Sequence, residues 1–192
     1  MCLEIIWLKP KRIVITGGPG TGKTSVIKNL EESGYLCFHE IIRDLTSEAI
    51  HGNDPSNYTT NPLQFVDDPF LFNTRILKGR LQQFLEAKEL EKQVVFFDRG
   101  IPDVLAYMDY FGQEYGEDFI DTCRINRYDQ VVILPPWKEI YKSDGERFES
   151  FDEARAIHEE LVKTYEFFEY APVTLPTGTV DERSQFVKNL FN

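Results

Sequence analysis

Cysteine is scarce in this sequence, and its spacing excludes two classes of small protein. The chain has three cysteines, Cys2, Cys37 and Cys123, which lie far apart and form no CxxC pair. An odd number of scattered cysteines predicts neither a disulfide framework nor a zinc site. This usage fits a reducing compartment, so we expect a cytoplasmic protein.

The chain also has few positively charged residues and no long apolar run. The chain has 21 Lys and Arg against 32 Asp and Glu, which gives a formal net charge of -11. Phosphate backbones and anionic membranes are bound mainly by clusters of Lys and Arg, so no nucleic acid and no membrane partner is expected. The apolar start, residues 1–8, is interrupted by Glu4 and is too short for a membrane span or an ordinary signal peptide.

What remains is the composition of an ordinary folded protein. A chain of 192 residues, 42% of them hydrophobic, can bury one substantial core but is short for two domains of usual size. We therefore expect a single domain over residues 1–192.

Apolar segments of two kinds alternate along the chain. Short β-branched or aromatic runs predict buried strands, and longer segments with apolar residues every three or four positions predict helices. Phe70, Phe72 and Phe84 are assigned to the core face of one such helix. The expected strands are 12–16, 35–38, 94–98, 131–134 and 173–175, and the expected helices are 23–32, 67–88, 101–111, 116–124, 151–168 and 180–191.

Continuously apolar strands between helices are typical of a parallel sheet that is covered on both faces. The sequence therefore predicts an α/β, doubly wound fold: a three-layer sandwich with five parallel strands in the middle.

One glycine-rich segment carries most of the functional information. Residues 17–24 read Gly-Gly-Pro-Gly-Thr-Gly-Lys-Thr and fit GxxxxGK[ST] at every position. The segment also follows an expected strand and opens an expected helix, which an ordinary glycine-rich turn would not require. It predicts a P-loop that binds a nucleoside triphosphate.

The residue types of this motif explain how it would bind. Glycines let the backbone aim successive N–H groups inward, and the following helix adds its positive end. Lys23 would neutralise the β and γ phosphates, and the Thr24 hydroxyl would bind Mg²⁺. The predicted nucleotide-binding residues are Gly17, Gly18, Pro19, Gly20, Thr21, Gly22, Lys23, Thr24 and Ser25.

Asp98 and Arg99 end the third expected strand, at the sheet edge where open α/β folds bind ligands. Asp98 could order the water shell of Mg²⁺ or accept a proton, and Arg99 could contact a phosphate. Glu40, just beyond the second strand, shares this edge and is the candidate base. Ordinary ion pairs, such as Glu40 with Arg43, would explain the same residues, and both interpretations stay open.

A polar stretch between the fourth strand and the long helix predicts a lid over about residues 138–156. Cations that close over a transferring phosphoryl group stabilise its charge and exclude water. Arg147 is therefore a candidate catalytic residue, as is Arg155, although an exposed arginine on a helix usually has no catalytic part.

These pieces, in this order, resemble small P-loop kinases of nucleosides and nucleotides. Asp98-Arg99 looks like the Asp/Glu-Arg motif of thymidylate and deoxynucleoside kinases, Glu40 resembles the acceptor-side base of the latter, and Arg147 resembles a lid arginine. Nearly the whole chain is also similar to predicted AAA-type ATPases of the NadR-like, kinase-related group. That similarity runs from Lys11 through residues 40–43, 97–100, 144–147 and 181–183.

The sequence differs from those of two related classes of P-loop protein, the AAA+ motors and the GTPases. A ring-forming AAA+ motor has Asp-Glu where this chain has Asp98-Arg99, and such a motor also carries a C-terminal helical domain. A GTPase has Asn/Thr-Lys-x-Asp, of which residues 141–144 supply only the second half. A motor is therefore not expected, and ATP is favoured over GTP.

The expected function is a Mg²⁺-dependent kinase that moves the γ-phosphoryl group of ATP to a small nucleoside-like or other metabolite acceptor. Lys23, Glu40, Asp98, Arg99 and Arg147 are the expected catalytic residues, with Thr24 and Asp98 placing the metal. The alternative is a nucleotide-dependent regulatory or binding module with slow or no hydrolysis. Neither the acceptor nor the oligomeric state follows from the sequence, because acceptor pockets are built from scattered side chains.

Overall fold

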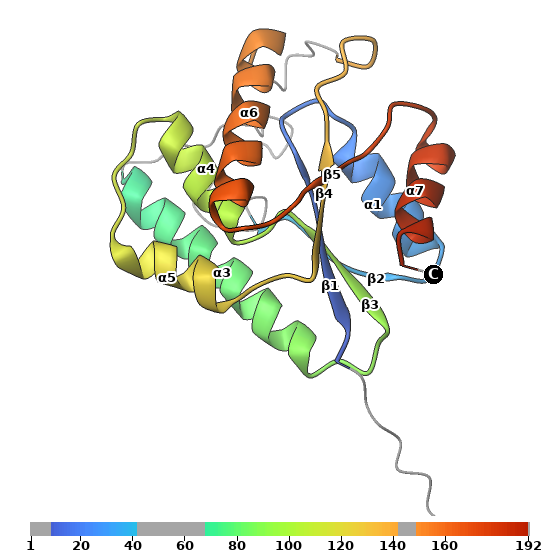
Figure 1. Ribbon diagram of the computed structural model, residues 1–192, viewed down its shortest axis with the longest axis horizontal. Coiled ribbons are helices and arrows are strands. Elements are labelled where there is room, and N and C mark those ends of the chain that lie inside the picture. Colours follow the sequence, from blue (N-terminus) through green and yellow to red (C-terminus); the bar gives the residue numbers. More distant parts are fainter. Residues whose placement is uncertain (1–8, 42–67, 142–148, 192) are drawn as a thin grey trace, which may run out of the picture.

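The computed structural model describes residues 9–41, 68–141 and 149–191, which form one parallel sheet between two layers of helices (Figure 1). All neighbouring strands pair in parallel, in the order β2-β3-β1-β4-β5. The predicted five-stranded α/β sandwich is confirmed. The strands are β1 (Lys11–Gly17), β2 (Leu36–Phe38), β3 (Val94–Asp98), β4 (Gln130–Leu134) and β5 (Val173–Thr174).

The helices lie on both sides of this sheet, as Figure 1 shows. One face is covered by α1 (Lys23–Glu32) and α7 (Val180–Asn189), which contact each other. The opposite face is covered by α3 (Pro69–Lys88), α4 (Pro102–Tyr110), α5 (Glu117–Ile125) and α6 (Phe151–Phe167).

Alternate residues of each strand serve the two faces of the sheet. In β1, Val14 belongs to the core under α3 to α6, whereas Ile13 and Ile15 belong to the core under α1 and α7. All three side chains are fully buried. Because both faces are covered, every position of the strand interior must be apolar, and this explains the continuous runs in the sequence.

The predicted elements lie within two residues of the observed ones, and local signals explain where the helices begin. The Asp68 carboxylate accepts a hydrogen bond from the N–H of Leu71, and Pro69 occupies the first turn of α3. Both α6 and α7 begin with a complete capping box, formed by Ser150 with Glu153 and by Thr179 with Glu182.

One assignment to the helix core is wrong. Phe72 and Phe84 are buried, but the Phe70 side chain is 52% exposed. Phe70 precedes Phe72 by two positions, so it projects from almost the opposite side of α3. Its ring contacts that of Phe119, with 5.8 Å between centroids.

Within the described ranges, no helix is both long and apolar enough to cross a membrane. Several predictions fall outside these ranges, namely Arg43, Arg147 and the central part of the expected lid, residues 142–148.

Candidate functional site

The P-loop connects the end of β1 to the start of α1, and its glycines permit close contacts with two helices. A Cβ atom on Gly18 would lie 2.8 Å from the carbonyl oxygen of Ala154 in α6. Gly22 has φ +80°, a left-handed conformation that a side chain disfavours. A Cβ atom on Gly22 would also lie 2.8 Å from Nη1 of Arg183 in α7, so the loop is bracketed by α6 on one side and by α7 on the other.

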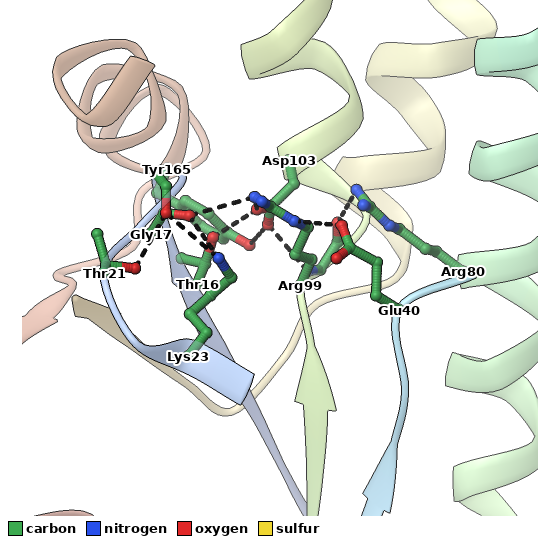
Figure 2. Close-up of polar contacts among 11 residues, drawn as sticks. Thr16, Gly17, Thr21, Lys23, Glu40, Arg80, Arg99, Asp103 and Tyr165 are labelled. Atoms are coloured by element: carbon green, nitrogen blue, oxygen red, sulfur yellow. Dashed lines mark hydrogen bonds and ion pairs between the residues drawn. The ribbon is translucent and has the colours of Figure 1, made fainter. Parts of the chain in front are cut away.

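Lys23 is buried within this loop, and burial disfavours its charged form. Its Nζ donates hydrogen bonds to the carbonyl oxygens of Gly17 at 3.0 Å and Gly18 at 3.3 Å (Figure 2). Burial, followed by the nearby positive charge of Arg99, lowers the pKa of Lys23 to about 8. The ammonium group therefore lies in a site that favours additional negative charge.

Arg99 connects the P-loop to the carboxylate of Glu40. Its backbone has φ 73°, which is uncommon for a residue with a side chain, and which directs the chain from β3 into α4. Its Nε donates to Glu40 Oε1 at 2.5 Å, and its Nη1 donates to the Gly17 carbonyl oxygen at 3.3 Å (Figure 2). The guanidinium carbon also lies 5.0 Å from the centre of the Tyr107 ring. Arg99 is therefore fixed beside the loop.

Asp103 anchors this arrangement through its buried carboxylate, and sequence reasoning missed it. The side chain is fully buried in the first turn of α4. Its Oδ2 accepts hydrogen bonds from the N–H of Gly100 at 2.9 Å and from the Tyr165 hydroxyl at 2.6 Å. Its Oδ1 accepts from Thr16 and from Arg99 Nη1. One carboxylate thus joins β1, α6 and the candidate catalytic arginine.

Replacement of Asp103 should test this anchor. We expect Asp103→Ala to lower the free energy of unfolding by about 3 kcal/mol, because Arg99 and three further buried donors lose their acceptor. Asp109→Ala on the same helix is the matched control, since Asp109 is exposed and its carboxylate accepts from the hydroxyl of the part-exposed Tyr115. Urea unfolding measures both, and equal losses would contradict the anchoring role.

The two candidate carboxylates have pKa shifts of opposite sign. Burial raises the pKa of Asp98, and the negative charge of Glu40 raises it further. Burial alone would also raise the pKa of Glu40, but the positive charges of Arg99 and Lys23 outweigh it, and the pKa is lowered. Asp98 Oδ1 is buried and has no hydrogen-bond partner in the described part of the chain. Asp98 is thus the carboxylate with a free acceptor.

Arg80 is a second residue that the sequence reasoning missed. It lies on α3, is 3% exposed, and donates from Nη1 to the carbonyl oxygen of Gly100 at 3.0 Å. Its charge lowers the pKa of both Glu40 and Asp98. Arg80 stands at helical spacing between the buried Ile76 and Phe84, and a charged residue on an apolar helix face was the available signal.

The structure brings most of the predicted site residues together. Lys23, Glu40, Asp98 and Arg99 are close enough for their charges to shift one another's pKa values. The first turn of α1 presents Thr24, half-buried, and Ser25, exposed.

One other sequence candidate lies apart from this group. Arg155 is exposed and pairs with Asp152 on α6 at 3.5 Å. His39, beside Glu40 in sequence, lies at the surface with its Nε2 2.7 Å from the Glu31 carboxylate.

A P-loop between β1 and α1, on a five-stranded parallel sheet with Asp-Arg after β3, defines a P-loop NTPase with a kinase-like fold. A family model described as an AAA domain matches residues 12–183. The chain belongs to this family. No curated protein matches the chain.

Solved structures of similar fold include named kinases. The NadR protein in complex with NR has a TM-score of 0.66 at 20% identity, over 94% of this chain and 50% of NadR. Thymidylate kinase from Candida albicans has a TM-score of 0.65 at 16% identity, over 95% of this chain and 91% of the kinase. Deoxyadenosine kinase from M. mycoides with bound dATP has a TM-score of 0.58 at 15% identity, over 93% and 98%. The chain thus spans half the length of NadR and nearly all of the other two.

Proposed function

We propose that the protein is a kinase that transfers the γ-phosphoryl group of ATP to a small, nucleoside-like acceptor. The observation that carries the proposal is Arg99, which bridges the carbonyl of Gly17 in the P-loop and the carboxylate of Glu40 on the acceptor side. Phosphoryl transfer depends on positioned cations beside the migrating group. The names of similar structures support the acceptor class, since they include NadR with NR and deoxyadenosine kinase with dATP.

The donor side follows from the loop. The backbone N–H groups and Lys23 would bind the β and γ phosphates, and Arg99 would stabilise the charge that spreads during transfer. The predicted lid arginine, Arg147, would add a further cation on closure. ATP is preferred to GTP because residues 141–144 supply only the second half of the Asn/Thr-Lys-x-Asp motif of GTPases.

A magnesium ion fits the residues at this site. Mg²⁺ bound to phosphate oxygens takes few protein ligands. The Thr24 hydroxyl and the unpartnered Oδ1 of Asp98 would hold the ion or its water shell. When bound, Mg²⁺ would neutralise charge on the phosphate oxygens.

The base is assigned to Asp98 rather than to Glu40. A base needs a free acceptor atom and a pKa that is not depressed. Asp98 has the unpartnered Oδ1, whereas Glu40 is engaged by Arg99 and has a lowered pKa. Glu40 would then act by orienting Arg99.

Nucleotide binding should take up a proton at alkaline pH. The pKa of Lys23 is about 8 in the free protein, so Lys23 is largely neutral at pH 8.5, and a bound triphosphate would restore its charge. We expect uptake of roughly half a proton or more on ATP binding at pH 8.5, and much less at pH 6.5, where Lys23 is already charged. Calorimetric titration in buffers of different ionisation enthalpy measures this, and equal uptake at both values would contradict it.

The acceptor can be sought by an ATP-consumption screen over nucleosides, nucleotides and vitamin-like alcohols, with water as the control acceptor. We expect consumption that depends on at least one nucleoside-like compound. Hydrolysis at the same rate in every well would contradict the kinase and favour a nucleotide-dependent regulatory module.

A further inference from the structure

Arg183 is a buried cation without a counter-charge. It lies in the second turn of α7 and is 4% exposed. Its Nη2 donates to the carbonyl oxygen of Thr21 at 2.8 Å, and its buried Nε has no hydrogen-bond partner. Across the described ranges no carboxylate lies within ion-pair distance of it. Burial lowers the pKa of Arg183, and no neighbouring charge opposes that shift.

Arg127 makes similar contacts but differs from Arg183 in its exposure to water. Arg127 also donates to backbone carbonyls, those of Phe168 and Glu169, and also lies over an aromatic ring, that of Tyr170. However, Arg127 is exposed, so water solvates its charge. Arg183 makes the same kinds of contact while excluded from water, which carries a large free-energy cost unless an anion compensates it.

The position of Arg183 is fixed by the docking of α7 on α1 (Figure 1). Asn29 of α1 donates to Asp181 at 2.9 Å, and Lys188 of α7 donates to Ser33 at 2.9 Å. The guanidinium carbon lies 5.9 Å from the Trp137 ring centre, and a Cβ atom on Gly22 would approach Nη1 to 2.8 Å. The cation is therefore held against the outer side of the P-loop.

Its hydrogen bond controls one peptide group of the loop. Thr21 O and Gly22 N belong to the same peptide, which is trans, so the carbonyl and the N–H point in opposite directions. Gly22 lacks a side chain and adopts a positive φ, so this peptide can rotate readily. A guanidinium that holds the carbonyl on the outer side leaves the Gly22 N–H directed into the loop, where phosphates bind.

We propose that Arg183 is a positioning residue of the donor site, which orients the Gly22 N–H toward the phosphates and whose unpaired charge is balanced by the bound triphosphate. The inference rests on the proposed triphosphate site. Both effects act on phosphate groups, so they are independent of the nucleobase.

Calorimetric titration with ATP and with inorganic tripolyphosphate, both in EDTA, tests whether Arg183 acts on the phosphate groups, because tripolyphosphate has no nucleobase. We expect Arg183→Met to raise the dissociation constants of both ligands by a similar factor, about tenfold or more. Arg183→Gln, which keeps a donor for Thr21 O but has no charge, should give an intermediate loss for both. Arg127→Met is the matched control and should bind both ligands as the wild type does.

Each other result counts against the inference. If Arg183→Met binds both ligands with unchanged affinity, the inference is overturned while the triphosphate site stands. If Arg183→Met loses affinity for ATP alone, the inference is also overturned, because Arg183 then contacts the nucleoside part of ATP. A wild type that binds neither ligand removes the proposed triphosphate site as well. If Arg183→Met does not fold, Arg183→Gln decides: an equal loss for both ligands supports the inference, and no loss overturns it.

Discussion

Lys23→Met is expected to lower ATP turnover by about a thousandfold, because it removes the positive charge that the P-loop aims at the phosphates. The buried ammonium lies at hydrogen-bond distance from two loop carbonyls, those of Gly17 and Gly18, and is close to Arg99 and Asp98. No other described lysine lies in the loop. Turnover with saturating acceptor and the dissociation constant for ATP are the quantities to measure.

The stability of this variant should move differently from its activity. The pKa of Lys23 is lowered from 10.5 to about 8, so between these values the unfolded chain binds more protons and stability rises with pH. Below pH 8 the buried charge therefore destabilises the free protein, by roughly 3 kcal/mol before its hydrogen bonds are counted. Lys23→Met should consequently unfold at pH 7 with no lower free energy than the wild type.

Lys28→Met is the matched control for both measurements, since Lys28 lies on the same helix and is exposed. It should leave turnover and ATP affinity unchanged. Comparable loss of turnover in the two variants, or full turnover in Lys23→Met, would contradict the assignment of the P-loop as the donor site.

Asp98→Asn is the second substitution with a large expected effect. It removes the free carboxylate oxygen that we assign to the acceptor proton and to the metal water shell, so turnover should fall by about a thousandfold. Glu40→Gln should cost less, because it weakens only the orientation of Arg99. Steady-state turnover across pH 5 to 9 compares the two.

The structure offers a control for this pair as well. Asp129 precedes β4 and pairs with Arg12 at 3.1 Å, at the sheet edge opposite the P-loop, so Asp129→Asn should retain full turnover. If Glu40→Gln loses more activity than Asp98→Asn, the roles of the two carboxylates are reversed and Glu40 is the base, as the resemblance to deoxynucleoside kinases implies.

The fold followed from the sequence because its local signals agree with one another. Ile13, Val14 and Ile15 must all be apolar when a strand is covered on both faces, and this run is visible without any structure. Phe70 was misassigned because a hydrophobic residue in the first turn of a helix resembles its core neighbours in type and differs only in angular position.

The candidate site residues could be proposed from sequence only where a short motif or a strand end marks them. Lys23, Glu40, Asp98 and Arg99 were proposed in this way, and the structure places them close together. Asp103, Arg80 and Arg183 act through contacts between elements that are distant in sequence, such as Tyr165 with Asp103, or Arg183 with Thr21. Such contacts depend on how α3, α6 and α7 dock, so local spacing does not encode the partners, although it marks Arg80 as a charged residue on an apolar helix face.

Transfer of label from γ-phosphate-labelled ATP tests the central claim most directly. The protein is incubated with Mg²⁺ and a mixture of nucleoside-like acceptors, and the products are separated from inorganic phosphate, with Lys23→Met in parallel. We predict label in an acceptor product for the wild type and almost none for the variant. Label that appears only in inorganic phosphate, or equally with both proteins, would contradict a kinase whose donor site is the P-loop.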